Sequence, residues 1–351
     1  MLRARRAWTF AAVVVVLTVF GQVLGRSRAD RPAPPPASKD AFTSAASCQE
    51  LLRKGERLAR PPGRARFASW NLRWFPDGEP REGAAKTDLA WLACALGWLD
   101  VDVLAVQEMK QTPGADRALL QLLAELNRLS GGRYVARLDD CGSRVPQHVG
   151  LIWNEARVSA EGLETVAALN PREGACQDQL RPGLAARVRS VGGLDLTVVS
   201  AHFKSKTDAR AFGLREKSFA AVPGALAALT ARARDTDVLL LGDLNTMGCR
   251  SCSPTVSATQ EQDLVRQRLT AASLSLLPAD SAGTELFGGR STLLDHAVVA
   301  ASMRELPAAA RVHVAGSCAA AGSKRAAPAE ARRALSDHCP IVLDLIDRDL
   351  D

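Results

Sequence analysis

An apolar stretch that ends in a carboxylate and a carboxamide constrains this chain more than any other feature. Residues 238–241 are Val-Leu-Leu-Leu, and Gly242, Asp243, Leu244 and Asn245 follow directly. A short apolar run of this kind, ended by glycine, is typical of a buried strand. Residues two apart in an extended chain point the same way, so we expect Asp243 and Asn245 to face one target at the strand's end. Turn chemistry alone would also place Asp and Asn there, so the interpretation depends on the other strand ends.

Other predicted strands carry the same kinds of residue at their ends. The strand at 66–72 is expected to end at Asn71, the strand at 101–108 ends on Glu108, and the strand at 194–201 is followed by His202. Two further strands, 291–299 and 340–345, are flanked by Asp295-His296 and by Ser336-Asp337-His338. Ligands of α/β proteins often bind at such edges of a sheet.

The remaining pattern predicts an α/β (α+β) protein with mixed sheets. Helices are expected at 48–59, 86–98 with Thr87 as N-cap, 115–129, 208–232 and 260–271, and further strands at 133–138, 148–153 and 184–189. The pair 184–189 and 194–201 reads as a hairpin around Gly192-Gly193. Because strands outnumber helices and some links are hairpins, mixed sheets are favoured over an all-parallel one.

The first 47 residues differ from the rest of the chain. Residues 1–29 have a basic start and an apolar run, which predicts a signal peptide, with an uncleaved N-terminal anchor as the alternative. Residues 30–47 are rich in Pro, Ser and Ala and read as a linker, which leaves one domain at 48–351. Six arginines and one aspartate in the first 31 residues carry about +5 of the total +7. The basic balance is therefore weak evidence for a nucleic-acid partner.

Eight cysteines follow the leader, at positions 48, 94, 141, 176, 249, 252, 318 and 339. An even number in a chain with a signal-like start predicts disulfides and an exported protein, periplasmic or secreted. The pairing cannot be read from the sequence. Cys249 and Cys252 are interpreted as a structural loop bridge, because no second Cys/His pair at zinc spacing accompanies them. Cys94 lies in an apolar helical pattern and could simply be buried.

The side chains at the strand ends divide into two chemical sets. Asn71, Glu108, Asp243, Asn245 and Asp337 offer hard oxygen atoms, which suit Mg²⁺, Mn²⁺ or Ca²⁺ better than zinc. His202, His338 and Asp295 are candidates for proton transfer or hydrogen bonding. Hydrolysis at phosphorus needs a cation to neutralise charge, a group that orients and deprotonates water, and donors for the nonbridging oxygens. These residues match that division of labour.

Six short motifs, in order, resemble those of the endonuclease/exonuclease/phosphatase superfamily. They are Ser69-Trp70-Asn71-Leu72, Val106-Gln107-Glu108, Ser200-Ala201-His202-Phe203-Lys204, Gly242-Asp243-Leu244-Asn245, Leu294-Asp295-His296 and Ser336-Asp337-His338-Cys339-Pro340. Each motif alone is weak, but six in the right order are strong. The resemblance covers residues 66 to 347 and implies a four-layer sandwich, in which two packed mixed β-sheets are flanked by helices.

The resemblance also implies roles for single residues. Asn71, Glu108 and Asp337 would surround a divalent cation, Mg²⁺ or else Mn²⁺ or Ca²⁺. Asp243, with Asn245, would orient or activate the attacking water, and His338, held by Asp295, would bind the phosphate or transfer a proton. His202 matches the deoxyribonuclease and phosphatase branches, whereas abasic-site endonucleases have tyrosine there.

Three more positions are expected to contact the substrate. Arg181, before Pro182, resembles the arginine of the family's phosphate-gripping loop, and Lys204 lies two residues after His202. Gln147 stands where pancreatic-type deoxyribonuclease has a glutamate that supports the first histidine. An amide can orient the His202 ring but cannot stabilise its charged form as a carboxylate would.

The predicted function is that of an exported, metal-dependent phosphodiesterase, a nuclease of low sequence specificity acting on DNA or RNA. The first alternative keeps the chemistry but takes a phospholipid, a sphingolipid or a phosphomonoester as substrate. Aromatic residues make up only 5% of the chain and form no evident hairpin cluster, which disfavours a lipid substrate. The second alternative is an inactive binding module. No stable protein partner is predicted, and membrane contact is expected only through an uncleaved N-terminal segment.

Overall fold

The computed structural model describes residues 41–78, 85–144, 146–172, 176, 180–287, 290–320 and 329–351. The predicted signal peptide and the linker up to residue 40 lie outside these ranges. Ala41 and Phe42 are buried in the core, and helix α2 (Ala45–Arg53) begins three residues before the predicted domain start. The folded part therefore begins ahead of residue 48. No helix in these ranges has both the length and the apolar composition needed to cross a bilayer.

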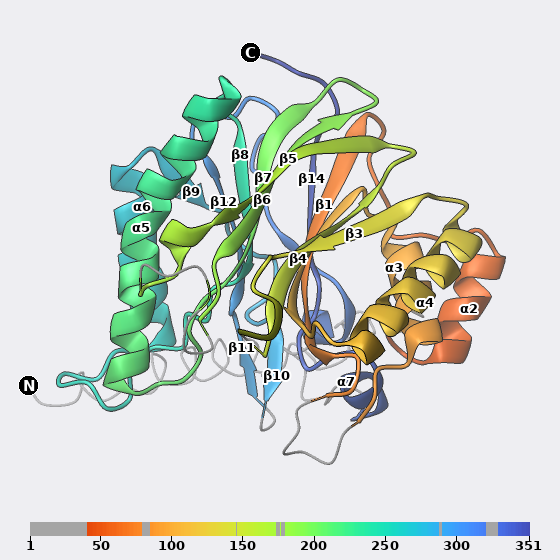
Figure 1. Cartoon of the computed structure of the whole chain (residues 1–351), viewed down its shortest axis with the longest axis horizontal. Coiled ribbons are helices and arrows are strands. Elements are labelled where there is room, and N and C mark those ends of the chain that lie inside the picture. The colour runs from red at the N-terminus through yellow and green to blue at the C-terminus, as the bar shows by residue number, and fades with distance from the viewer. Residues whose placement is uncertain are drawn as a thin grey trace, which may run out of the picture. The chain divides into compact units, whose positions relative to one another are not determined.

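Two six-stranded mixed sheets form the centre of the described fold (Figure 1). In the first sheet the strand order is β13 (His313–Val314), β14 (Ile341–Ile346), β1 (Arg64–Phe75), β2 (Val103–Met109), β4 (His148–Asn154) and β3 (Tyr134–Leu138). In the second it is β5 (Val158–Val166), β6 (Gly183–Ser190), β7 (Asp195–His202), β8 (Val238–Asp243), β12 (Asp295–Ala300) and β9 (Leu274–Leu276). A small hairpin joins β10 (Glu285–Phe287) to β11 (Arg290–Thr292).

Helices cover the outer faces of both sheets, which confirms the predicted four-layer sandwich (Figure 1). On one side lie α2, α3 (Leu89–Leu99) and α4 (Pro113–Ser130), and on the other lie α5 (Ala209–Ala233) and α6 (Ala258–Ala271). A short helix, α7 (Ala329–Ala334), and three 3₁₀ turns, η1 (Gly142–Arg144), η2 (Ala167–Leu169) and η3 (Gly316–Ala320), complete the described elements.

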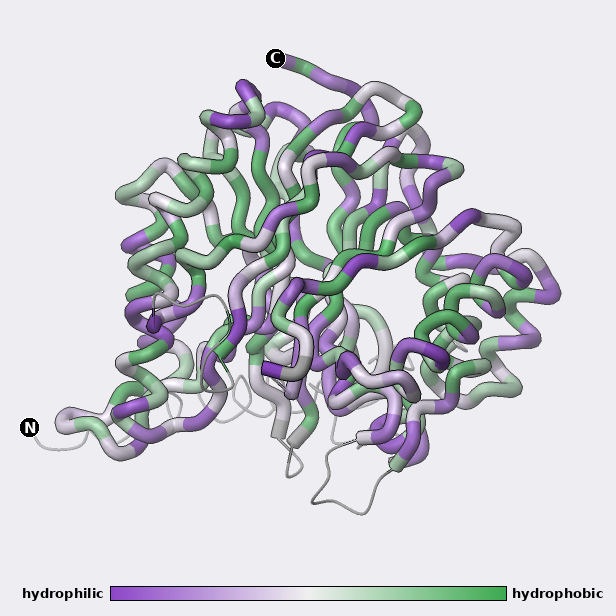
Figure 2. The backbone as a smooth tube through the Cα atoms, viewed as in Figure 1, coloured by the Kyte–Doolittle hydropathy of each residue, from purple (hydrophilic) through white to green (hydrophobic). Residues whose placement is uncertain are grey.

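Alternation along β1 explains how one strand serves two cores. Phe67 packs between the two sheets, whereas Ala68 and Trp70 pack against the helices α2 and α3. Successive side chains of a strand point to opposite faces, so a strand covered on both sides places apolar residues on both of its faces. In Figure 2 hydrophobic stretches, drawn in green, run along the strands at the centre of the molecule.

Several predicted boundaries need correction. The helix predicted to start with Thr87 as its cap begins instead after Asp88, whose side chain accepts a hydrogen bond from the Trp91 amide. Strand β1 does not end at Asn71 but continues to Phe75 through a register shift. The strand predicted at 291–299 is divided into β11 and β12. The hairpin around Gly192-Gly193 is confirmed by antiparallel pairing of β6 with β7.

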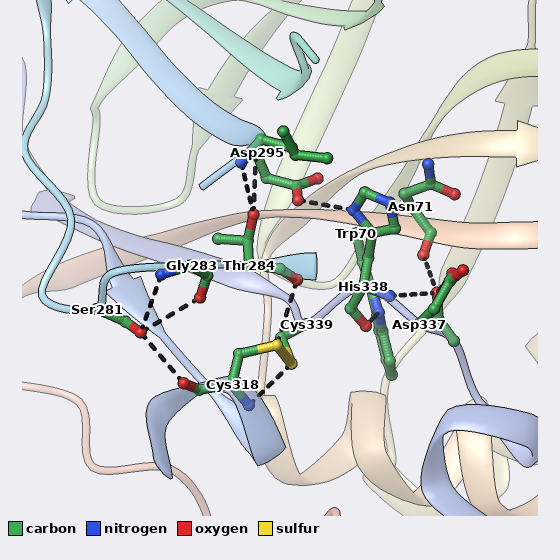
Figure 3. The surroundings of a disulfide bond; sticks show 12 residues. Trp70, Asn71, Ser281, Gly283, Thr284, Asp295, Cys318, Asp337, His338 and Cys339 are labelled. Carbon is green, nitrogen blue, oxygen red and sulfur yellow. Dashed lines mark hydrogen bonds and ion pairs between the residues drawn. A yellow bond between two sulfur atoms is a disulfide. The ribbon is translucent and has the colours of Figure 1, made fainter. Parts of the chain in front are cut away.

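Four disulfides account for all eight cysteines: Cys48–Cys94, Cys141–Cys176, Cys249–Cys252 and Cys318–Cys339. The predicted loop bridge between Cys249 and Cys252 is confirmed. Cys94 is not merely a buried thiol, because it ties α3 to α2 through Cys48. Cys318–Cys339 links η3 to the segment that enters β14, directly beside the predicted site residue His338 (Figure 3). Such bonds persist in oxidising compartments.

Candidate active site

Three strands of the second sheet bring three of the predicted side chains together. Strands β7 and β8 run parallel with His202 opposite Asp243, and β12 pairs antiparallel with β8 so that Asp295 is opposite Asp243 as well. Asp243 is therefore flanked on both sides by predicted site residues. All three are almost fully buried.

The first sheet supplies the facing half of the cluster. Parallel strands β1 and β2 place Asn71 opposite Gln107, and Glu108 follows with φ of +60°, where the pairing is irregular. Asp337 and His338 enter from the segment that leads into β14. The indole Nε1 of Trp70 donates to the carbonyl of His338 over 2.9 Å and so fixes that segment against β1.

One carboxylate oxygen joins the two halves. Asn71 Nδ2 donates to Asp243 Oδ2 over 2.9 Å, while His202 Nε2 lies 3.4 Å and His338 Nε2 3.7 Å from the same oxygen. Burial raises the pKa of Asp243 to about 8; His338 opposes this rise, and Asp295 adds to it. A carboxyl group whose pKa lies near neutral pH, with neighbouring donors, thus lies where the sheets meet.

The two histidines have opposite charge preferences. Burial lowers the pKa of His202 well below its usual value, and the cations Arg181 and His338 lower it further. Burial would also lower the pKa of His338, but Asp295 and Asp243 outweigh burial and raise it well above the usual value. His338 Nδ1 lies 2.8 Å from Asp295 Oδ2 (Figure 3). His202 is therefore neutral at neutral pH and His338 charged.

The predicted metal ligands offer the right donor atoms. Glu108 is 17% exposed at its side chain, and one of its oxygens accepts a hydrogen bond from the Trp74 amide over 3.1 Å. Burial and then the charge of Asp337 raise the pKa of Glu108, so these two carboxylates lie close enough to repel each other. Repulsion between hard oxygen donors is relieved by a divalent cation, so the residues present fit Mg²⁺ or a similar ion.

A second acidic grouping overlaps the site. Asp243, Asp295 and His338 each offer an atom within 4.8 Å of the others, and Asp295 Oδ1 is buried without a hydrogen-bond partner. The other oxygen of Asp295 contacts His338 Nδ1, and His338 Nε2 faces Asp243. The three residues therefore fit a chain of hydrogen bonds as well as they fit a metal site.

Comparison with known proteins identifies the fold. The catalogued endonuclease/exonuclease/phosphatase structure from Bacteroides vulgatus matches with a TM-score of 0.55 and 12% identity, over 82% of this chain and 99% of that chain. A mannosyl-6-phosphatase from Bacteroides thetaiotaomicron matches with a TM-score of 0.54 and 17% identity, over 80% of this chain and 99% of that chain. D. rerio TDP2 complexed with a single-strand DNA product matches with a TM-score of 0.52 and 13% identity, over 80% of this chain and 98% of that chain.

The chain has the endonuclease/exonuclease/phosphatase fold. No protein-family model matches the sequence. No curated protein matches it either. At identities of 12% to 17% the structural matches show the endonuclease/exonuclease/phosphatase fold alone, so the activity must be argued from the side chains themselves.

Two sequence-based expectations about single residues are wrong within this fold. Strand β8 ends at Asp243, and Asn245 has φ of +53°, so the extended-chain argument for a shared target fails. The Asn245 side chain instead donates to the carbonyl of Phe203, which ties the β8 end to the β7 end. Gln147 does not orient His202: it accepts a hydrogen bond from Arg181 over 2.7 Å, and His202 Nδ1 has no partner.

Arg181 and Lys204 lie on the basic side of the cluster. Burial lowers the pKa of Arg181, while the charges of Glu108 and Asp243 oppose that change, and Arg181 Nε is buried without a hydrogen-bond partner. Lys204 lines a neighbouring cavity of about 230 Å³ whose other cationic lining residues are Arg172, Lys206 and Arg210. Arg181 is thus a buried cation near the acidic side chains, whereas Lys204 belongs to the neighbouring cavity, which Asp208 also lines.

Sequence reasoning gave no role to two residues that hold the site in place. The Ser336 hydroxyl donates to the Asn71 carbonyl over 2.6 Å and accepts from the His338 amide. Thr284 Oγ1 accepts from the Leu294 and Asp295 amides, and its carbonyl accepts from the Cys339 amide (Figure 3). Ser336 lies within a recognised motif, which was a usable signal, whereas nothing near Thr284 marks it.

Proposed function

We propose that this protein is an exported, divalent-metal-dependent phosphodiesterase, and specifically a nuclease of low sequence specificity that hydrolyses DNA or RNA. The observation that carries the proposal is the meeting of Asn71, His202 and His338 around one oxygen of Asp243. A buried carboxylate with three such neighbours is suited to accept a proton from an attacking water. The four disulfides support an oxidising location and hence export.

The residues divide the chemistry between them. Asp243 would orient and deprotonate water, while charged His338, held by Asp295, would donate to a nonbridging or leaving oxygen of the phosphate. Neutral His202 and the unpartnered Nε of Arg181 would hold the remaining phosphate oxygens. Asn71, Glu108 and Asp337 would hold the cation, which supplies charge neutralisation on the phosphate.

The test is hydrolysis of supercoiled plasmid DNA and of RNA by the purified protein with Mg²⁺. We expect Asp243→Asn to lower kcat by about 10²- to 10⁴-fold, the range for loss of a general base. The matched variant Asp263→Asn changes an exposed aspartate of α6 and should keep full activity. EDTA should abolish activity, and Mg²⁺ in excess should restore it.

A panel of other phosphate esters tests the substrate class. Release of inorganic phosphate from phosphomonoesters, or of phosphocholine from sphingomyelin, with DNA and RNA left intact, would reject the nuclease assignment and keep the hydrolase chemistry. Equal activity of wild type, Asp243→Asn and chelated enzyme would reject the mechanism. Metal-independent binding of a partner with no turnover of any ester would support the inactive binding module.

A further inference from the structure

A second group of carboxylates lies at the other end of the second sheet. Asp237 directly precedes β8 and Asp243 is its last residue, so the two are about 20 Å apart at roughly 3.3 Å per residue. Around Asp237 gather four more acidic residues, from the turn after α5, the segment after β12 and the end of the chain: Asp235, Glu305, Asp349 and Asp351. Figure 1 shows the C-terminus at the end of the molecule opposite to α7 and the β10–β11 hairpin.

The five carboxylates form two overlapping sets. Asp235, Asp237 and Asp351 each offer an oxygen within 4.8 Å of the others, and so do Glu305, Asp349 and Asp351. Asp351 belongs to both sets. No arginine or lysine forms an ion pair with any of the five within the described ranges. Arg304 lies nearby, but its guanidinium donates to the Leu350 carbonyl and not to one of these carboxylates.

Buried members of the cluster point to a ligand. Glu305 is 1% exposed; its Oε1 accepts from the Leu350 amide over 2.7 Å, but its Oε2 is buried with no hydrogen-bond partner. Asp237 is 2% exposed, and burial followed by a side-chain hydrogen bond with Glu305 raises its pKa to about 8, so a proton held between these two carboxylates is the competing explanation. A buried carboxylate oxygen without a donor is costly unless a cation or a proton meets it.

We infer that Asp235, Asp237, Glu305, Asp349 and Asp351 form a calcium site that fastens the C-terminal segment to the segment before β8 and the segment after β12. Calcium takes six to eight oxygen ligands with flexible geometry, which suits five carboxylates from three segments. Magnesium demands octahedral geometry and usually keeps only one or two carboxylates, so it fits this cluster less well. The site is independent of the hydrolase chemistry proposed above, because none of its residues belongs to the active site.

The test uses the full-length chain carrying Glu108→Gln and Asp337→Asn, which removes the two carboxylates proposed to hold the cation at the active site. With about 10 mM CaCl₂ we expect a rise in Tm of about 5 °C, as for an extracellular-type site near 10⁻⁴ M affinity, and a smaller rise with MgCl₂. Adding Asp349→Asn and Asp351→Asn should abolish the calcium-dependent rise. Adding Glu161→Gln and Asp263→Asn instead, two exposed acidic residues outside the cluster, should preserve it.

A second measurement separates a calcium site from a proton shared by Asp237 and Glu305. Without calcium, the Asp349→Asn/Asp351→Asn variant should have a Tm equal to or above that of its parent, because two repelling charges are gone. Equilibrium dialysis should find one more bound Ca²⁺ in the parent than in this variant. No calcium-dependent rise in Tm, no difference in bound Ca²⁺, or an undiminished rise in the variant would each overturn the inference.

Discussion

The Asp295–His338 pair shows how one residue can set the charge of another. The Asp295 carboxylate contributes to the raised pKa of His338, so the Asp295→Asn variant should lower that pKa. Since the proposed mechanism needs charged His338, activity is present below its pKa and is lost as pH rises through it. The alkaline limb of the pH–rate profile should therefore move to lower pH, with kcat at pH 8 reduced about 10²-fold.

The chain offers a matched control for this prediction. His313 and Asp280 form a similar histidine–aspartate contact of 2.6 Å, but both are exposed and lie outside the site. Asp280→Asn should leave the pH–rate profile unchanged. An unshifted profile in Asp295→Asn would show that Asp295 does not support the charge of His338.

The predictable part of the site was the identity of its polar side chains. Glu108 and Asp243 lie at or next to the end of a strand and His338 lies shortly before β14, where buried apolar runs give way to polar residues, whereas Asn71 lies inside β1. Their partners could not be predicted, because partners depend on which distant segments meet. Gln147 illustrates this: its place in the sequence suggests His202 as its partner, yet its side-chain oxygen accepts a hydrogen bond from Arg181.

At the scale of an element, β12 carries a buried histidine that should make the fold sensitive to acid. Burial lowers the pKa of His296 to about 4, and its Nε2 lies 2.8 Å from the Thr246 hydroxyl. The unfolded chain, with a histidine pKa near 6.5, binds more protons between pH 6.5 and 4, so stability falls as pH drops through that window. Between pH 8 and pH 5 this histidine should cost about 2 kcal/mol of unfolding free energy.

Urea unfolding at both pH values measures this effect. The loss of stability on going from pH 8 to pH 5 should be smaller in His296→Gln than in wild type by that amount. The exposed His313, changed to Gln, is the control and should keep the wild-type difference. Identical losses in wild type and His296→Gln would contradict the assignment.

Two disulfides close loops of very different length, and this difference predicts how much each contributes to the unfolding free energy. Cys48–Cys94 closes 46 residues between α2 and α3, whereas Cys249–Cys252 closes only 3. Loop-closure entropy gives about 4 kcal/mol for the first and about 1.6 kcal/mol for the second. Replacing both cysteines by alanine should therefore lower the unfolding free energy more for the first pair, as measured by denaturant titration. Equal losses would mean that local packing, and not loop length, sets the contribution.

Element types were more predictable than element ends. Amphipathic spacing placed the helices α3, α4, α5 and α6 within a few residues, because side-chain burial follows the period of the helix. Strand β1 was expected to stop at a polar residue, but Asn71 is itself buried, and a register shift carries the pairing on to Phe75. Such irregular pairing has no short-range signal, since it depends on the neighbouring strand.

For the whole molecule, the location of positive charge matters more than its total. Most of the net +7 belongs to the first 31 residues, yet four cationic side chains line one cavity beside the active site: Arg172, Lys204, Lys206 and Arg210. Burial lowers the pKa of Lys204, and the nearby charges of Lys206 and Arg181 lower it further. Asp208 also lines the cavity, so four cations and one anion leave a formal charge of +3, and we expect a second phosphate of an extended substrate to bind there.

Substitutions in this cavity should therefore weaken the binding of a polynucleotide and leave the hydrolysis of a small diester unchanged. In Lys206→Gln/Arg210→Gln we expect KM for DNA to rise about tenfold at low salt, and the slope of log KM against log salt to fall by about 1 to 2, one step per lost phosphate contact. Turnover of bis(p-nitrophenyl) phosphate, which has a single phosphate, should be unchanged. The control Arg117→Gln/Lys217→Gln removes two exposed cations elsewhere and should alter neither KM for DNA nor the salt slope. If both double variants change the salt slope equally, general surface charge guides the substrate; if neither does, the extended substrate does not reach this cavity.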